Sequence, residues 1–295
     1  MSSTFQRLAV LGLGLLGGSV AGATRRSGAA RQVVGSARRR EPLERALDLG
    51  IVDEIGSTEE AVTGADLVVL AMPVGSMEAV LAEAAPHLAP GTLVTDVGSV
   101  KGALVERLPG LLPANVDYVG AHPMAGSHLG GVENARDDLF VDSRCVISAG
   151  PSTPAKATER VAGFWRALGA RVIFRRAEDH DSQVAWVSHA PHAVAFAFAH
   201  ALEGAPPASG ELAGTGFQDF IRIARSDPAM WAEILHSNRE ALAAPLEAMA
   251  RSLTELASAI EQGDMEAEGN FLARALDTLE GMAPCAPPDG GPPPV

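Results

Sequence analysis

Short apolar runs alternate with amphipathic stretches along the first half of the chain. The runs have the length and composition of buried strands, and they occupy residues 8–11, 32–36, 65–72, 92–96, 117–120, 144–148 and 171–174. Stretches with helical periodicity lie between them, among them residues 41–49, 75–88 and 158–168. Strands that alternate with helices predict an α/β fold with a doubly wound parallel sheet.

The pattern changes near residue 175, where the strand signals end. Helical periodicity continues in three stretches, at residues 177–203, 229–258 and 263–279. The first is apolar nearly all round at residues 194–198, and a helix without a polar face is buried in a core or against another subunit.

These patterns divide the chain into three parts. We expect a sheet domain over residues 1–175 and an all-α domain over residues 176–280 that joins two copies of the chain into a homodimer. The proline- and glycine-rich tail, residues 281–295, is expected to be disordered.

Composition narrows the class of protein. Of the 295 residues, 47% are hydrophobic and 20% are charged, which is typical of a soluble globular protein. No apolar run is long enough to cross a bilayer, and no signal-peptide core precedes the first strand, so we expect a cytoplasmic protein without a membrane partner. The net charge of −13 argues against nucleic-acid partners. The two cysteines, Cys145 and Cys285, suggest neither a disulfide framework nor a metal site.

The first apolar run leads into a glycine-spaced turn, G-L-G-L-L-G, at residues 12–17. Gly12 allows the tight turn, Gly14 lets the backbone approach a pyrophosphate, and Gly17 lets the next helix pack close to the strand. The free N–H groups at the start of that helix attract phosphates. A glycine-rich structural loop is the alternative, but the position between strand and helix favours a Rossmann-type dinucleotide site.

The end of the second apolar run indicates which dinucleotide binds. An acid is expected there in NAD-binding sites, whereas this chain has Ser36 followed by Ala37 and three arginines. Arginines favour a 2′-phosphate, so we expect NADP, with NAD possible; a solvated basic turn is the alternative. The expected cofactor-binding residues are Gly12, Leu13, Gly14, Leu15, Leu16, Gly17, Ser36, Arg38, Arg39, Met72 and Pro73.

Two further loops follow strands at the same edge of the sheet, where ligands bind in such folds. The segment Asp96–Lys101 offers a hydroxyl and an ammonium; Ser99 as a helix N-cap beside an exposed Lys101 is an equally good interpretation. His122, beside Pro123, could accept a proton near neutral pH, or it could be a structural histidine.

The helical half carries a second polar cluster. His180 and Asp181 precede Ser188, His189 and His192, and we expect Pro191 to kink the helix there. Two histidines on an apolar element need hydrogen-bond partners. A third metal ligand is missing at a suitable spacing, so a metal site is not expected. The alternative to a substrate site is a pair of core histidines whose hydrogen bonds are made within the protein.

Arg222 is flanked by Phe220, Ile221 and Ile223, which should face a core. A buried arginine needs an anion, which could be Asp219, Asp227 or the carboxylate of a substrate. Trp231 follows as a core anchor or a pocket wall.

Five motifs together resemble the prephenate/arogenate dehydrogenases of tyrosine biosynthesis over about residues 8–260. They are the glycine turn at 12–17, D-V-G-S-V-K at 96–101, H-P-M-A-G at 122–126, S-H-A-P-H at 188–192 and the segment 217–228. The resemblance implies a Rossmann domain, an all-α dimerisation domain, and oxidative decarboxylation of a cyclohexadienol with NAD(P).

The resemblance also implies roles for single residues. His122 would take the proton from the ring hydroxyl, and Ser99 would orient that hydroxyl or the nicotinamide. Ser188, His189, His192 and Trp231 would bind the substrate, and Arg222 would hold its carboxylate. Two departures from the family pattern are the missing acid after the second strand and the lack of a regulatory domain after the helical part.

Three alternatives remain open at this point. The substrate could be prephenate or arogenate. A β-hydroxyacid dehydrogenase shares the same two-part architecture, although the paired histidines and the Arg222 segment do not resemble its catalytic lysine region. A nucleotide-sensing protein without catalysis would bind NADPH and leave prephenate unchanged.

Overall fold

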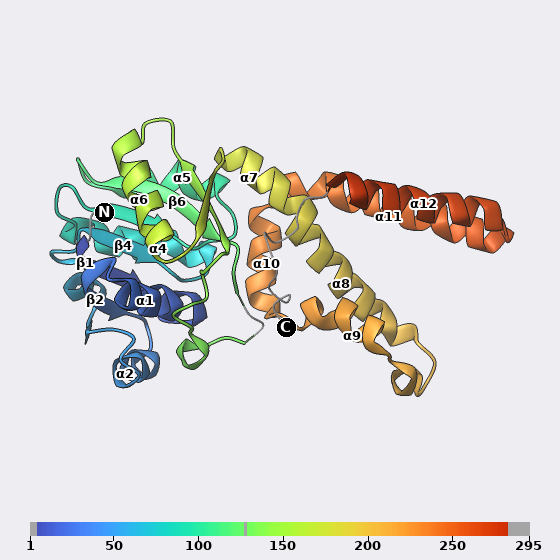
Figure 1. Ribbon diagram of the computed structural model, residues 1–295, viewed down its shortest axis with the longest axis horizontal. Helices are drawn as coiled ribbons and strands as arrows, with labels where there is room; N and C mark the ends of the chain where they lie inside the picture. The colour runs from blue at the N-terminus through green and yellow to red at the C-terminus, as the bar shows by residue number, and fades with distance from the viewer. Residues whose placement is uncertain (1–4, 127–128, 283–295) are drawn as a thin grey trace. The chain divides into compact units, whose positions relative to one another are not determined.

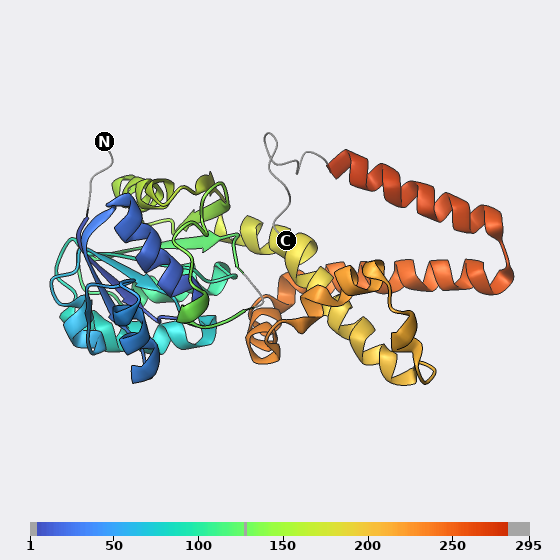
Figure 2. The same cartoon turned by 60° about the horizontal axis from the view of Figure 1, so that its bottom comes forward.

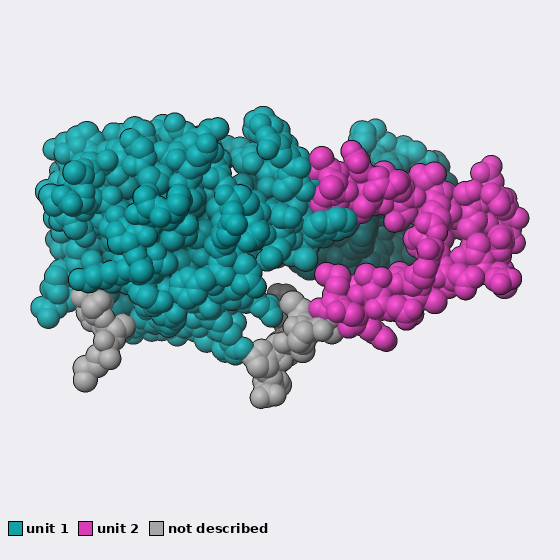
Figure 3. All heavy atoms as spheres, turned by 90° about the horizontal axis from the view of Figure 1, so that it is seen from above, with its two compact units in different colours: residues 1–242 teal, residues 243–295 magenta. Residues whose placement is uncertain are grey.

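The computed structural model describes residues 5–126 and 129–282. The chain consists of two compact units, residues 1–242 and residues 243–295 (Figure 3). The first unit contains the sheet, its covering helices and a run of further helices. The second contains most of α11 (Arg239–Gln262) and α12 (Met265–Met282), which are joined by a short turn and linked by an ion pair between Arg274 and Glu255.

The sheet has eight strands in the order β3-β2-β1-β4-β5-β6-β7-β8. The strands are β1 (Phe5–Leu11), β2 (Ala30–Ser36), β3 (Glu54–Ile55), β4 (Leu67–Leu70), β5 (Leu93–Asp96), β6 (Asp117–Pro123), β7 (Arg144–Ala149) and β8 (Arg171–Phe174). All neighbouring pairs are parallel except β6 and β7, which are antiparallel. The reversal follows from the connection between them, whose described part holds only a 3₁₀ turn, whereas a parallel pair needs a crossover helix.

Helices cover both faces of the sheet (Figures 1 and 2). One face packs against α1 (Leu15–Ser27), α2 (Arg40–Asp48) and α6 (Ala155–Ala167). The other packs against α3 (Thr58–Val62), α4 (Val74–Ala84) and α5 (Gly102–Arg107). Successive residues of β1 enter opposite cores, with Leu8 on the first face and Ala9 on the second, which explains why the strands are apolar throughout. The expected doubly wound α/β fold is confirmed.

The sequence periodicity missed the shortest elements. β3, α3 and α5 have two, five and six residues, which is too short for a periodic signal. The start of α3 nevertheless has a capping box, in which Ser57 and Glu60 exchange side chain-to-backbone hydrogen bonds.

The helical part of the first unit is more broken than the sequence suggests. The expected helix over 177–203 consists of α7 (Ala177–Val184), a π turn (Ala185–His189) and α8 (Ala190–Ala201). Pro191 lacks an N–H and crowds the preceding turn, and the wider π turn directly before it accommodates this. The expected helix over 229–258 is likewise divided at Asn238, between α10 (Pro228–Ser237) and α11. A short α9 (Thr215–Ile221) and a 3₁₀ turn, Arg222–Arg225, precede α10.

The apolar stretch at residues 194–198 is largely not buried within the chain. Only Ala195 of this stretch is buried, while Phe198 is 40% exposed and lies edge-on to Phe220, which is itself 44% exposed. Burial against another subunit therefore stays a prediction. Of the expected disordered tail, residues 281–282 belong to α12 and the rest lies outside the described residues. No described helix is both long and apolar enough to span a bilayer.

Candidate active site

The glycine turn after β1 leaves open space where a dinucleotide would lie. Gly12 has a φ of 98°, and a Cβ there would lie 2.5 Å from the carbonyl oxygen of Ala71. A Cβ on Gly17 would lie 1.8 Å from the carbonyl oxygen of Gly12, so this glycine brings α1 against the turn. A Cβ on Gly14, by contrast, meets no atom within 4 Å. The backbone of Gly14 is therefore open to a ligand at the start of α1.

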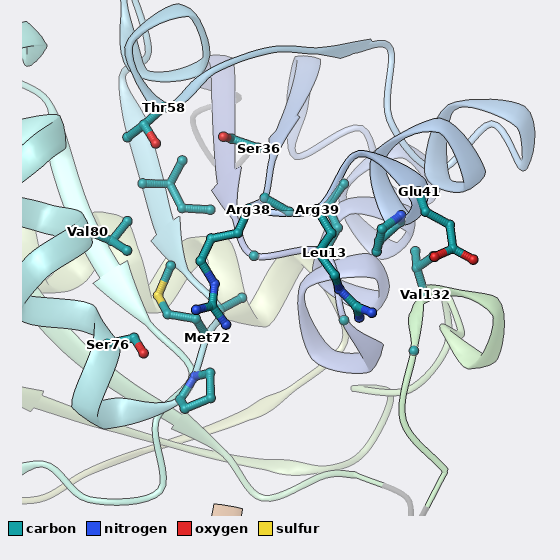
Figure 4. Close-up of a pocket in the computed structure, with 18 of the residues that line it drawn as sticks. Leu13, Ser36, Arg38, Arg39, Glu41, Thr58, Met72, Ser76, Val80 and Val132 are labelled. Atoms are coloured by element: carbon teal, nitrogen blue, oxygen red, sulfur yellow. The ribbon is translucent and has the colours of Figure 1, made fainter.

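A cavity of about 960 Å³ lies at this turn (Figure 4). Its walls come from the carboxyl ends of β1, β2 and β4, the point where the strand order reverses and ligands bind in such sheets. Eight of the expected cofactor residues line it: Gly12, Leu13, Gly14, Ser36, Arg38, Arg39, Met72 and Pro73. Leu15, Leu16 and Gly17 do not line it and belong to the helix that packs behind the turn.

The basic wall of the cavity follows β2. The carbonyl oxygen of Ser36 accepts a hydrogen bond from the Gly12 N–H at 2.7 Å, which joins the ends of β1 and β2. Arg38 and Arg39 are exposed on the cavity wall, with Arg38 extending toward Met72 and Arg39 beside Leu13 (Figure 4). Their guanidinium groups are free to meet an anion at the position that an acid occupies in NAD sites.

His122 lies within β6 rather than in a loop after it. The strand continues to Pro123 because His122 pairs with Val146 of β7. The side chain is buried, and its Nδ1 lies 2.8 Å from Nε2 of His180, whose Nδ1 in turn lies 2.7 Å from Oδ1 of Asp181. Both partners come from α7. This adjacent His-Asp pair is visible in the sequence, but its spacing alone does not assign it to the site.

The buried position lowers the pKa of His122 well below its usual 6.5. Burial is the main cause, because it penalises the charged imidazolium, and the neighbouring His180, Lys101 and His189 act in the same direction. His122 is therefore a neutral imidazole at physiological pH, which is the form that can accept a proton.

Lys101 is fully buried, so the alternative of an exposed lysine is wrong. Its ammonium pairs with the buried carboxylate of Asp96 and donates to the carbonyl oxygen of Ala121 at 2.9 Å. Asp96 also accepts from the Tyr118 hydroxyl and from the Ala121 N–H, both at 2.9 Å. This network fixes the end of β5 to the strand that carries His122.

Ser99 is not an N-cap, because α5 begins at Gly102 and its N-cap residue is Lys101. The side chain of Lys101 makes no capping hydrogen bond. The carboxylate of Asp181 takes that role and accepts from the N–H groups of Lys101 and Gly102 at 2.8 and 2.7 Å. Ser99 is half-buried in the loop. The neighbouring Gly98 packs against Val74, where a Cβ would lie 3.1 Å from Cγ2, so this loop adjoins the cofactor cavity beside Pro73.

His189 and His192 both face Trp231. The ring of His192 stacks on the indole at 3.7 Å between centroids, and the ring of His189 lies edge-on at 6.1 Å. Burial lowers the pKa of His189 to about 4, and it also lowers the pKa of His192. Trp231 packs with Ile234 and Val100, so it combines the two expected roles of core anchor and wall.

Arg222 is exposed, and the expectation that its segment faces a core is wrong for Phe220. Among the described residues Arg222 forms no ion pair with Asp227, whose carboxylate accepts from Met230 N at 2.9 Å and caps α10. The charge of Arg222 is close enough to His192 to contribute to its lowered pKa. Ser188 is half-buried, and its carbonyl oxygen accepts from Nδ1 of His192 at 2.9 Å.

Two buried polar atoms of this cluster have no hydrogen-bond partner among the described residues: Nε2 of His189 and Nε1 of Trp231. Unsatisfied buried polar atoms are costly, and a bound ligand would satisfy these two. The cluster runs from His122 through His189 and His192 to Arg222, all in the first unit. The described residues contain no group of three or more His, Cys, Asp or Glu arranged to hold a metal.

Comparison with known proteins gives one consistent assignment. Residues 20–174 match the model of the prephenate dehydrogenase nucleotide-binding domain, and residues 176–277 match that of the prephenate dehydrogenase dimerization domain. The chain is 32% identical to the prephenate dehydrogenase of Bacillus subtilis over 96% of this chain and 77% of that protein. It is 33% identical to the cyclohexadienyl dehydrogenase of Zymomonas mobilis, covering 89% of this chain and 91% of that protein.

A solved structure agrees with these relatives. Prephenate dehydrogenase from A. aeolicus, crystallised with hydroxyphenyl propionate and NAD+, superimposes with a TM-score of 0.88 at 33% identity, over 96% of this chain and all of that chain. Both halves of the chain, the sheet and the helices with the histidine cluster, are matched. The chain belongs to the prephenate dehydrogenase family.

Proposed function

We propose that this chain catalyses the NAD(P)-dependent oxidative decarboxylation of prephenate to 4-hydroxyphenylpyruvate, a step of tyrosine biosynthesis. One observation supports this most directly: a buried, neutral histidine and an exposed arginine lie at opposite ends of one polar cluster. Prephenate carries a ring hydroxyl and carboxylates, which are the groups that such a pair would bind.

The glycine turn fits the cofactor. Gly14 has free space where a pyrophosphate would approach, and the cavity is large enough for a dinucleotide. When bound, NAD(P)+ accepts the two electrons and the hydrogen from the ring carbon that bears the hydroxyl. The N-terminal end of α1 and the Gly12–Gly14 backbone would hold its phosphates.

His122 is the proposed general base. Its neutral imidazole takes the proton of the ring hydroxyl as that carbon becomes a carbonyl. The C–C bond to the ring carboxylate then breaks, CO2 leaves, and its electron pair makes the ring aromatic. The resulting phenolate recovers the proton from His122, so the base is regenerated and no proton is released overall.

The other substrate contacts come from the helical part of the unit. Arg222 is the proposed carboxylate-binding residue, because it is an exposed cation near His192 that forms no ion pair with any described residue. His189, His192, Ser188 and Trp231 would line the space between it and His122, and Ser99 would lie at the cofactor side.

We further propose a preference for NADP. Arg38 and Arg39 lie on the cavity wall directly after Ser36, at the end of β2. A 2′-phosphate would pair with these guanidinium groups, and Ser36 stands where NAD sites carry the carboxylate that would repel it.

The chain is proposed to work as a homodimer. Phe198 and Phe220 form an exposed apolar contact on the helices of the first unit, and Leu272, Leu276 and Leu279 of α12 are 57–66% exposed. Apolar surface of this kind is covered in assembled proteins, and the matched domain model describes a dimerization domain.

A grid of initial rates tests the function. Prephenate and arogenate are each offered with NAD+ and with NADP+, and cofactor reduction is followed by absorbance. We expect the highest kcat/KM for prephenate with NADP+. A higher value for arogenate would reassign the substrate, and no reduction with either would leave a nucleotide-binding role only.

A further inference from the structure

Asp181 is the branching point of two hydrogen-bond networks that end on site histidines. Its carboxylate contacts Nδ1 of His180 at 2.7 Å and accepts from the N–H groups of Lys101 and Gly102. Its backbone carbonyl accepts from the side-chain amide of Asn238 at 2.9 Å. One network continues to His122 and the other to His189.

The first network determines which nitrogen of His122 carries the proton. Two backbone amides stabilise the Asp181 carboxylate as an acceptor, so Nδ1 of His180 must be the donor. A neutral His180 then has a bare Nε2, which accepts from Nδ1–H of His122 at 2.8 Å. Nε2 of His122 is left unprotonated, as a base requires.

The second network determines which nitrogen of His189 carries the proton, and it is the opposite nitrogen from that of His122. Only the NH2 group of Asn238 can donate to the carbonyl of Asp181, and this fixes the orientation of the amide. The same nitrogen lies 2.9 Å from Nδ1 of His189, which must therefore accept. The proton of a neutral His189 is on Nε2, the buried atom that lacks a partner among the described residues.

We propose that His180 and Asn238 are positioning residues that hold His122 and His189 as opposite neutral tautomers. His122 offers a bare Nε2 that accepts, and His189 offers an Nε2–H that donates. The roles of both histidines toward a substrate rest on the proposed function, but the tautomers themselves do not.

The pair would distinguish ligands by their hydrogen-bonding groups. An Nε2–H donor satisfies a carboxylate or keto oxygen and cannot accept from an ammonium group. His189 thus favours a substrate that presents an oxygen at this position. The charges that act on His122 are those of His180, Lys101 and His189, and those that act on His189 are Asp181, His180 and His192. Burial is the main cause that lowers the pKa of both rings, which favours their neutral forms.

Nitrogen NMR of the full-length chain labelled with 15N-histidine tests the proposal without any ligand. The ring signals of His122 and His189 are assigned by their loss in His122→Asn and His189→Asn. At pH 7.5 we expect the Nδ1–H pattern for His122 and the Nε2–H pattern for His189. The same tautomer at both residues, or an imidazolium at either, would overturn the proposal.

Variants of the two positioning residues test the cause. In His180→Gln the amide oxygen replaces Nε2 as an acceptor, whereas His180→Leu keeps the volume and offers none. We expect the Gln variant to keep the Nδ1–H pattern of His122 and the Leu variant to lose it, with kcat about tenfold or more lower at nearly unchanged KM. In Asn238→Asp the new carboxylate accepts instead of donating, so His189 should move its proton to Nδ1.

Equal spectra for the Gln and Leu variants would overturn the role of His180, and an unchanged His189 in Asn238→Asp would overturn that of Asn238. The wild-type spectra remain decisive if a variant fails to fold. A chain with both expected tautomers but no prephenate oxidation would contradict the proposed function alone. Prephenate oxidation by a chain in which His122 and His189 have the same tautomer would contradict this inference alone.

Discussion

The cofactor cavity and the histidine cluster lie in the same unit but are built in different ways. The cavity is lined by glycine backbone and by exposed arginines that lie close together in the sequence. The cluster is assembled from side chains of β6, α7, the π turn, α8 and α10 and from Asn238, most of them buried, and most of its polar atoms have a specific partner. Backbone donors tolerate substitution of their neighbours, whereas a chain of side-chain hydrogen bonds depends on each member. Substitutions should therefore have larger effects in the cluster.

The largest effect is expected at the base. His122→Asn removes the proton acceptor and should lower kcat by about 10²–10⁴-fold with little change in KM, because the ring hydroxyl is still bound. Steady-state kinetics with prephenate measure this. His87→Asn, a substitution near the surface, is the matched control. Normal turnover in His122→Asn would contradict its assignment.

The pH profile gives the same assignment independently. The pKa of His122 is lowered below 6.5, and its active form is the deprotonated one. Activity should hold through neutral pH, and kcat/KM should fall only as the pH drops through this lowered pKa, about tenfold per unit. The residual activity of His122→Asn should lack this acid limb.

The next largest effect concerns stability. Lys101→Met leaves the buried Asp96 carboxylate without its cation and should lower the free energy of unfolding by about 3–5 kcal/mol. Denaturant titration followed by circular dichroism measures the change. Lys156→Met, at an exposed position of α6, is the control and should change stability by less than about 0.5 kcal/mol. Equal stability of the two variants would show that the ion pair does not hold β5 to β6.

The sequence predicted the cavity better than the cluster, and the reason is physical. The turn at 12–17 and the arginines after Ser36 act through local conformation and charge, which spacing reveals. The interior roles of His180, Asp181 and Asn238 depend on contacts between residues 57–80 positions apart in the chain. No periodicity records such pairs. The adjacent letters H-D at 180–181 were the one available signal.

The fold shows the same division. The strands and the longer helices were predictable because their apolar runs are long, and the parallel order followed from their alternation. The antiparallel β7 and the break at Asn238 were not, since they depend on how one connection is accommodated in three dimensions. Pro191 predicted a kink, but not the π turn that precedes it.

A smaller effect is expected at the rim of the cluster. If Arg222 held the carboxylate in a desolvated pair, Arg222→Ala would cost about 2–5 kcal/mol of substrate binding. Because Arg222 is exposed, we expect about 1.5 kcal/mol, a roughly tenfold rise in KM for prephenate with kcat nearly unchanged. Arg225→Ala, in the same 3₁₀ turn, is the matched control. A fall in kcat without a change in KM would remove Arg222 from carboxylate binding.

The smallest effect tests the cavity, where an exposed arginine meets a solvated phosphate. Arg38→Ala and Arg39→Ala should each raise KM for NADP+ about fivefold, equivalent to about 1 kcal/mol, and leave KM for NAD+ unchanged. Arg40→Ala is the control, because its guanidinium pairs with Glu44 at 2.6 Å and does not line the cavity. If the first two variants weaken both cofactors equally, the arginines attract the dinucleotide as a whole and do not select the 2′-phosphate. The two regions would then differ in specificity as well: the buried cluster would select its ligand, whereas the cavity would not distinguish NADP+ from NAD+.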